Sequence, residues 1–176
     1  MTAHITLILG GARSGKSTAA EQLAIDSARV LFVATAESLD AEMEHRIKAH
    51  RRGRPADWHT LEEPRDLISA LQPLLGAYDV FVLDCITMWV SNLLLEQEDP
   101  GDGEQRLAAE ARRLLNLIET SDATWILVSN EVGMGLVPTS PLGRVFRDAL
   151  GRVNQIIAAR ADRVKLMIAG LSFEVR

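Results

Sequence analysis

Short runs of apolar residues alternate with longer segments of helical periodicity along the whole chain. The apolar runs predict buried strands at 5–9, 30–34, 80–84, 125–129 and 164–168, with shorter strands at 58–61 and at the end of the chain. The periodic segments predict helices at 16–29, 40–51, 64–74, 86–96, 104–120 and 141–160. Because the runs are continuously apolar rather than alternating, we expect an α/β fold with a mostly parallel sheet and helices on both faces.

Composition supports one folded domain over residues 1–176, since 47% of the residues are hydrophobic and 24% are charged. The net charge of −5 makes general nucleic-acid binding a poor candidate function. The single cysteine, Cys85, excludes an intrachain disulfide framework and a cysteine-rich metal site. No apolar run is long enough to span a membrane, and no basic segment precedes an apolar one at the start. We therefore expect a cytoplasmic protein without a signal peptide.

The strongest chemical signal is a glycine-rich segment that matches the phosphate-binding pattern G-x-x-x-x-G-K-[ST]. It reads Gly10-Gly11-Ala12-Arg13-Ser14-Gly15-Lys16-Ser17 and lies between a predicted strand and a predicted helix. Glycines let successive backbone N–H groups face one anion, and a helix N-terminus adds the positive end of its dipole. We predict a P-loop in which Lys16 reaches the β and γ phosphates of a nucleoside triphosphate and Ser17 binds Mg²⁺. The alternative is a glycine-rich turn with a coincidental lysine.

A second magnesium ligand is expected at Asp84, which closes the apolar strand 80–83. In an open parallel sheet the carboxyl ends of the strands meet at the ligand crevice, so Asp84 should lie near Ser17. The alternative is that Asp84 caps the helix that follows.

Residues 130–135, Asn-Glu-Val-Gly-Met-Gly, follow another predicted strand and should lie at the edge of the same crevice. The two glycines indicate a loop that closely approaches a ligand, although a plain turn also fits. The segment lacks the lysine and aspartate of the Asn-Lys-x-Asp pattern, which makes a switch-type GTPase a poor candidate.

The four histidines, His4, His45, His50 and His59, show no convincing metal-ligand spacing. His50 stands among arginines at positions 46, 51, 52 and 54. A histidine among arginines suits a position beside a bound phosphate, and imidazole can act as a nucleophile towards phosphorus. Composition alone favours the alternative of a solvated surface histidine. We expect Cys85 and the tryptophans to pack in the core rather than to act chemically.

Further segments complete a wider pattern, at 34–36, 40–43, 46–47 with His50, 53–55, 84–87, 92–94, 129–138, 146–148 and 151–155. Together with residues 10–17, they resemble the bifunctional adenosylcobinamide kinase / adenosylcobinamide-phosphate guanylyltransferase family of cobalamin biosynthesis. The similarity covers nearly the whole chain. Its most specific stretches are Asn-Glu-Val-Gly-Met-Gly at 130–135 and Gly-Arg-Val-Asn-Gln at 151–155.

The resemblance implies a P-loop, RecA-like domain that forms homotrimers and uses GTP and ATP with Mg²⁺. It implies that a nucleoside triphosphate phosphorylates the aminopropanol hydroxyl of adenosylcobinamide. A histidine then attacks the α-phosphate of GTP, expels pyrophosphate and passes GMP to the cobinamide phosphate, which gives adenosylcobinamide-GDP. His50 matches that histidine, although the family often has two adjacent histidines where this chain has Ala49-His50.

The resemblance also carries nucleotide contacts onto a defined set of residues, in addition to the P-loop. They are Ala34, Thr35, Ala36, Arg51, Arg52, Gly53, Arg54, Glu62 and Asp84, where the family often has Glu at the last position. The arginines can neutralise charge near His50 and disfavour its protonated form, which keeps the nucleophile neutral.

Two other functions compete with this interpretation. One is a simple small-molecule kinase, in which His50 takes no part in the chemistry. The other is a nucleotide-dependent binding module for nucleic acid or a protein partner. The acidic balance and the lack of a strip of aromatic and basic residues disfavour the module.

Overall fold

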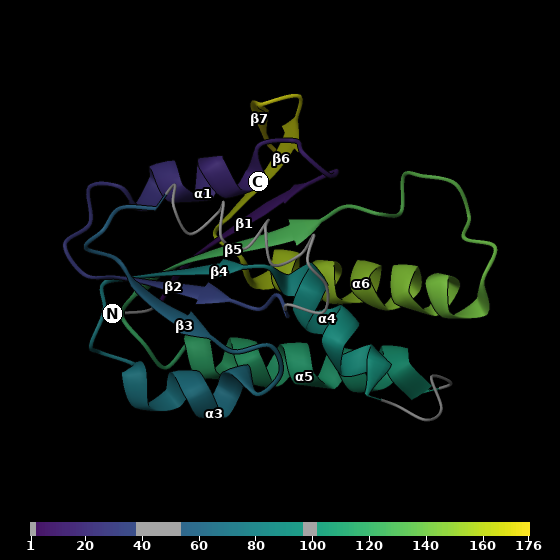
Figure 1. Cartoon of the computed structure of the whole chain (residues 1–176), viewed down its shortest axis with the longest axis horizontal. Coiled ribbons are helices and arrows are strands. Elements are labelled where there is room, and N and C mark those ends of the chain that lie inside the picture. The colour runs from purple at the N-terminus through teal and green to yellow at the C-terminus, as the bar shows by residue number, and fades with distance from the viewer. Residues whose placement is uncertain (1–2, 38–53, 97–101) are drawn as a thin grey trace.

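The protein is built around one seven-stranded sheet with the strand order β3-β2-β4-β5-β1-β6-β7 (Figure 1). The computed structural model describes residues 3–37, 54–96 and 102–176. Neighbouring strands run parallel except for the β6–β7 hairpin at one edge. Helix α1 lies on one face of the sheet, and the other described helices lie on the opposite face (Figure 1). The predicted α/β fold with a mostly parallel sheet is confirmed.

The strands are β1 (His4–Gly10), β2 (Val30–Ala34), β3 (His59–Glu62), β4 (Val80–Asp84), β5 (Thr124–Asn130), β6 (Arg163–Ile168) and β7 (Leu171–Glu174). The helices are α1 (Lys16–Ala24), α3 (Leu67–Leu71), α4 (Ile86–Leu95), α5 (Gly103–Ile118) and α6 (Pro141–Arg160), with a 3₁₀ turn at Gln72–Leu74. These bounds agree with the predicted elements except at two helices. The helix expected at 40–51 lies outside the described residues.

Two helices are shorter than predicted because local hydrogen bonds set their ends. Helix α1 stops at Ala24, where the amide of Ser27 donates to the Ala24 carbonyl in a tight turn. Helix α3 starts at Leu67 rather than at Pro64. The Glu63 carboxylate accepts hydrogen bonds from the backbone amides of Arg65 and Asp66. The Asp66 carboxylate then caps the helix by accepting from the amide of Ser69.

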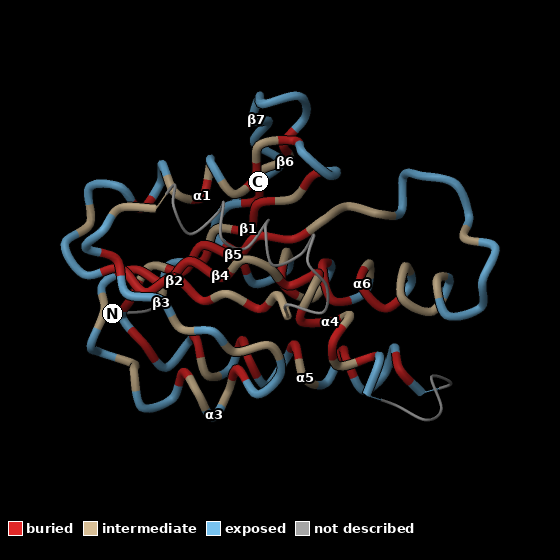
Figure 2. Tube along the Cα trace, viewed as in Figure 1, coloured by how far each residue is buried: buried red, intermediate tan, exposed pale blue. Residues whose placement is uncertain are grey.

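The core consists of two apolar layers, one on each face of the sheet. Figure 2 shows that the central strands are mostly buried. On β4, Val80 and Val82 pack in the layer under α1, whereas Phe81 and Leu83 pack in the layer under the other helices. This alternation explains why the strands are apolar at every position. The tryptophans, Trp58, Trp89 and Trp125, are all buried as predicted. No helix in the described part of the chain is long and apolar enough to cross a membrane.

Candidate functional site

The glycine-rich segment forms the turn between β1 and α1. Gly15 precedes the first helical residue, Lys16, and adopts a left-handed conformation with φ 95°. Gly11, Ala12 and Arg13 are exposed, so the outer side of the loop is open to a ligand. The free N–H groups of the first turn of α1 face this loop, which is the geometry expected of an anion-binding site.

The turn of the C-terminal hairpin supports the loop from one side. Ala169 and Gly170 connect β6 to β7 and both have positive φ values, 52° and 83°. The amide of Gly170 donates a hydrogen bond of 3.0 Å to the carbonyl of Ser14. A Cβ on Gly15 would lie 3.3 Å from the Cα of Gly170, so the two turns are in close contact. This support could not be predicted from the sequence, because the contact joins residues that are far apart in the chain.

Two polar side chains of the loop are buried. The Lys16 ammonium donates a hydrogen bond of 2.6 Å to the carbonyl of Gly11. Burial lowers the pKa of Lys16, and the charges of Cys85 and Asp84 partly oppose this shift. The Ser14 hydroxyl is also buried, and it has no hydrogen-bond partner among the described residues. A bound polyanion would accept further hydrogen bonds from the Lys16 ammonium.

The ends of three neighbouring strands place the predicted contact residues in one row. Ala34 of β2 pairs with Glu62 of β3 on one side and with Asp84 of β4 on the other. Strand β5 separates β4 from β1, so Asp84 lies one strand away from the start of the glycine-rich loop. Asp84 is nevertheless close enough to Lys16 to affect its pKa.

Asp84 does not cap the helix that follows it. The N-cap of α4 is Cys85, and no side chain donates or accepts a capping hydrogen bond there. No group of three or more His, Cys, Asp or Glu side chains gathers as a metal site among residues 3–37, 54–96 and 102–176. A carboxylate and a hydroxyl such as those of Asp84 and Ser17 nevertheless suit Mg²⁺, which usually takes its other ligands from water and phosphate.

A buried tie fixes the ends of β2, β3 and β4 relative to one another. The Thr35 hydroxyl donates to the carbonyl of Cys85 at 2.7 Å and accepts from the amide of the same residue at 2.8 Å. The Asn92 amide donates to the carbonyls of Thr35 and Pro64 at 2.8 and 3.0 Å. This tie holds the segments after β2 and β3 against the Asp84–Cys85 segment. A lone asparagine in the apolar helix α4 was the sequence signal that could have revealed it.

A second tie holds the end of β5. The amide of Asn130 donates to the Thr87 hydroxyl at 2.7 Å, and its carbonyl accepts from the Asn154 side chain at 3.1 Å. Asn154 also accepts a hydrogen bond of 2.7 Å from the buried Ser129 hydroxyl. The amide of Glu131 then donates to the carbonyl of Gly10 at 3.0 Å. Residues 130 and 131 are thereby attached both to the helices beneath them and to the glycine-rich loop.

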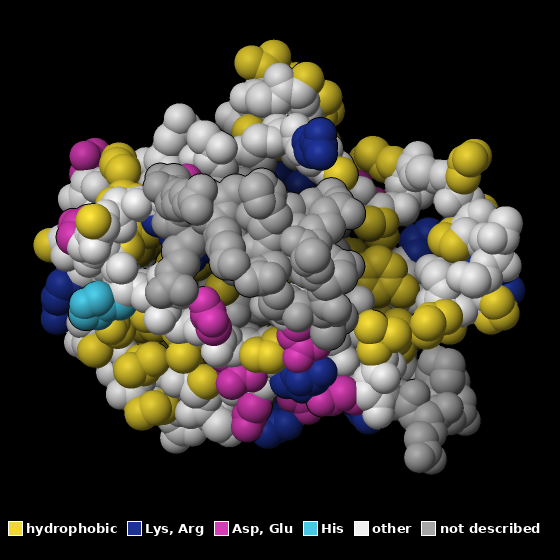
Figure 3. All heavy atoms as spheres, viewed as in Figure 1, with side chains coloured by type: hydrophobic (Ala, Val, Ile, Leu, Met, Phe, Trp, Pro, Cys, Tyr) yellow, Lys and Arg dark blue, Asp and Glu magenta, His cyan; other side chains and the backbone are white. Residues whose placement is uncertain are grey.

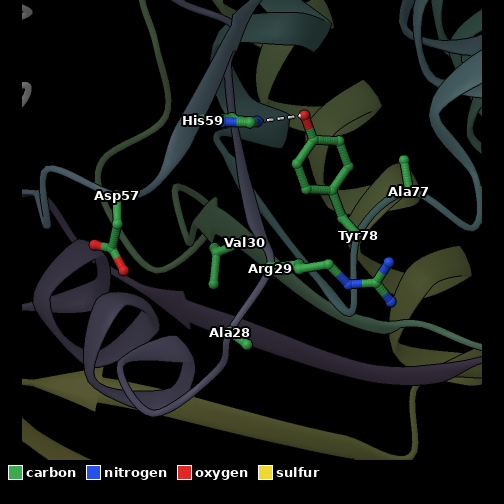
Figure 4. Close-up of a pocket in the computed structure, with 7 residues that line it drawn as sticks. All are labelled: Ala28, Arg29, Val30, Asp57, His59, Ala77 and Tyr78. Carbon is green, nitrogen blue, oxygen red and sulfur yellow. Dashed lines mark hydrogen bonds between the residues drawn. The ribbon is translucent and has the colours of Figure 1, made fainter.

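The two described histidines lie away from the site, at the amino ends of parallel strands. His4 contacts Asp162 at the start of β1. His59 begins β3, and its Nδ1 lies 2.7 Å from the hydroxyl of Tyr78 in an open pocket of about 340 Å³ (Figure 4). Because phosphates would lie at the carboxyl ends of the strands, neither histidine is placed to reach them.

Of the predicted contact residues Arg51, Arg52 and Arg54, only Arg54 lies within the described residues. Arg54 lies over the ring of Phe32, with its guanidinium carbon 3.4 Å from the ring centroid. Phe32 belongs to the layer under α1, so Arg54 lies on the α1 side of the sheet. His50, Arg51, Arg52 and Gly53 lie outside the described residues, as does His45.

The first testable consequence concerns Gly10. A Cβ there would lie 2.5 Å from the backbone carbonyl of Met167 on the neighbouring strand, so β1 and β6 would have to move apart. We expect Gly10→Ala to lower the free energy of unfolding by about 1–3 kcal/mol. Gly11→Ala is the matched control, because no atom lies within 4 Å of its added methyl group. Urea unfolding measures both variants, and equal losses would contradict the packing argument.

The second consequence concerns the Cys85 thiol. Burial, followed by the charge of Asp84, raises its pKa from 9.0 to about 11. The thiolate fraction at pH 8 is therefore about a hundredfold lower than for an ordinary thiol. We expect Cys85 to react correspondingly slowly with a disulfide reagent in the folded protein and at an ordinary rate in urea. Similar rates in the two states would show that the thiol is not desolvated.

Comparisons with known proteins identify the family of this chain. Residues 6–175 match the family model described as cobinamide kinase / cobinamide phosphate guanyltransferase. The chain is 43% identical to a bifunctional adenosylcobalamin biosynthesis protein of Escherichia coli, over 97% of this chain and 98% of that protein. It is 46% identical to one of Pseudomonas aeruginosa, over 97% of this chain and 96% of that protein.

A solved structure supports the fold independently of these relatives. An ATPase from a bacterial type III secretion system superposes with a TM-score of 0.59 at 11% sequence identity. The match covers 97% of this chain and 56% of the ATPase, so it speaks for the P-loop fold alone. With a family model that matches almost every residue and relatives of 43–46% identity, the chain belongs to the cobinamide kinase / cobinamide phosphate guanyltransferase family.

Proposed function

We propose that this protein catalyses both family reactions at the glycine-rich loop. A nucleoside triphosphate phosphorylates the free hydroxyl of adenosylcobinamide, and GMP from GTP is then transferred to the new phosphate. The observation that carries this proposal is a glycine-rich loop, formed between β1 and α1, in a chain that matches the bifunctional family over residues 6–175.

The proposed nucleotide site follows the carboxyl edge of the sheet. Its triphosphate lies on residues 10–17, where the buried ammonium of Lys16 turns from Gly11 to the phosphates. Its other contacts come from the strand-end row and from the arginine segment, namely Ala34, Thr35, Ala36, Arg51, Arg52, Gly53, Arg54, Glu62 and Asp84. The in-register row of Glu62, Ala34 and Asp84 supports a single ligand that spans β3, β2 and β4.

In the kinase reaction, the hydroxyl oxygen of the acceptor attacks the γ-phosphorus, and the bond to the β-phosphate oxygen breaks. The developing charge on the leaving diphosphate faces Lys16 and the amides of the loop, which stabilise it electrostatically. Mg²⁺ bound by Ser17 and Asp84 would supply further neutralisation of the phosphates when present.

In the transferase reaction, a ring nitrogen of His50 attacks the α-phosphorus of GTP and pyrophosphate leaves. A phosphate oxygen of the phosphorylated acceptor then attacks the same phosphorus, the nitrogen–phosphorus bond breaks and the histidine is regenerated. The positions of His4 and His59 at the other end of the strands support the assignment to the segment that contains His50.

We further propose that the protein works in the cytoplasm, where both nucleotides are available, and that it forms the homotrimer of the resembled family. The β6–β7 hairpin supports self-association, because its edge exposes apolar side chains. They are Ile168, Leu171, Phe173 and the following Val175. Exposed apolar sheet edges are uncommon in proteins that remain monomeric.

A magnesium titration tests the role of Asp84. Because its carboxylate has no hydrogen bond to a described side chain, Asp84→Asn should fold normally. We expect kinase turnover to fall at least about tenfold and to need more Mg²⁺. The control is Asp79→Asn at the opposite end of β4, where Asp79 pairs with Arg29. A normal rate and magnesium dependence for Asp84→Asn would remove Asp84 from the metal site.

Labelling with GTP that is radioactive at the α-phosphate tests His50. If His50 carries GMP, His50→Ala should lose both the acid-labile label and guanylyl transfer. The kinase step needs a positioned γ-phosphate and an acceptor hydroxyl, so it should survive at least in part.

The controls are His45→Ala, five residues away, and His59→Ala at the far end of β3. Both should keep the label. Loss of label in His45→Ala alone would move the nucleophile there. A wild-type protein that phosphorylates cobinamide without acquiring any label would support a simple kinase instead.

A further inference from the structure

In the segment from Glu131 to Ser140, which we call the β5–α6 loop, several large apolar side chains are unusually exposed. Leu136 is 96% exposed, Met134 is 82% exposed and Val137 is 64% exposed, and Leu142 follows in the first turn of α6. Figure 3 shows hydrophobic side chains gathered along this part of the molecule, at the right of the view. Single exposed apolar residues are ordinary, but a group of this kind marks a surface that binds something.

The loop begins directly beside the phosphate site. Asn130 pairs in register with Gly10, and the amide of Glu131 donates to the Gly10 carbonyl at 3.0 Å. From there the chain extends beyond the strand ends and returns to α6 (Figure 1). The proposed nucleoside contacts follow β2 and β3, on the other side of β4. The loop therefore borders the phosphates on the side that the nucleoside leaves free.

Hydrogen bonds hold the loop in this shape from both ends. Thr87 and Asn154 fix the peptide groups of Asn130, and the Glu131 carboxylate accepts a hydrogen bond from the amide of Gly133. At the other end, the Arg144 guanidinium donates to the carbonyls of residues 138 and 139 at 3.0 and 2.7 Å. The loop is anchored at its backbone, and the side chains of Met134, Leu136 and Val137 remain exposed.

We propose that the β5–α6 loop is the docking surface for the corrinoid acceptor. The acceptor must bring one hydroxyl or phosphate arm to the glycine-rich loop while its wide ring rests elsewhere. A corrin ring is broad and carries methyl groups as well as amide side chains, and its methyl groups suit the exposed side chains of Met134, Leu136 and Val137. Because Glu131, at the start of the loop, contacts Gly10, a ring bound to the loop would lie beside the phosphates. This inference rests on the cobinamide-dependent activity proposed above.

The double variant Met134→Ser/Leu136→Ser tests the docking surface. Both side chains are exposed, so the fold should be unaffected, which circular dichroism and the thermal midpoint check. Equilibrium dialysis that follows the visible absorption of adenosylcobinamide measures the Kd, and kinase assays measure KM for each substrate. We expect the Kd and the KM for adenosylcobinamide to rise at least about tenfold, with the KM for the nucleoside triphosphate unchanged.

The matched control is Leu23→Ser/Ile25→Ser at the end of α1, where the two side chains are 44% and 53% exposed. It should bind adenosylcobinamide like the wild type. Unchanged corrinoid affinity in the loop variant would overturn the proposal. A lower native mass by light scattering would also overturn it, because the loop would then contact a second copy. Failure of the wild type to phosphorylate cobinamide would instead reject the proposed function.

Discussion

The parallel pairing of β2, β3, β4, β5 and β1 is the constraint on which the site depends. Parallel strands end at the same edge of a sheet, so residues that are far apart in sequence arrive together there. The register places Glu62, Ala34 and Asp84 side by side and sets Asn130 against Gly10. The two apolar layers hold this register, because a slip by one residue would exchange the side chains that face α1 with those that face the other helices.

Register alone does not position the segments that continue beyond the strands. Buried polar side chains do so, through the tie of Thr35 and Asn92 after β2 and the tie of Thr87 and Asn154 after β5. Such groups are costly to bury without partners, so the hydrogen bonds select one arrangement of each loop. The apolar core thus sets where the strands end, and the polar ties set how the loops leave them.

The sequence was sufficient to predict most of the fold, because continuous apolar runs mark strands that are covered on both faces. The start of α3 was wrongly predicted at Pro64. The Glu63 carboxylate accepts hydrogen bonds from the backbone amides of residues 65 and 66, so these residues do not enter the helix. The glycine-rich loop was recognised because its residues are contiguous. The contact of Gly170 with Ser14 and the ties through Asn92 and Asn154 were missed, since each joins distant parts of the chain and depends on tertiary packing.

The glycine-rich loop buries two polar side chains that have few hydrogen-bond partners among the described residues. Lys16 is buried enough for its pKa to fall, and its ammonium donates to the backbone carbonyl of Gly11. The Ser14 hydroxyl is buried beside it without a hydrogen bond to a described residue. A neighbouring polyphosphate would raise the pKa of Lys16 again and accept hydrogen bonds from its ammonium. Binding of phosphate would therefore offset the energetic cost of burying these groups. The stabilisation is largest for the ligand state that has the most negative charge at the loop. A departing diphosphate or pyrophosphate acquires that charge.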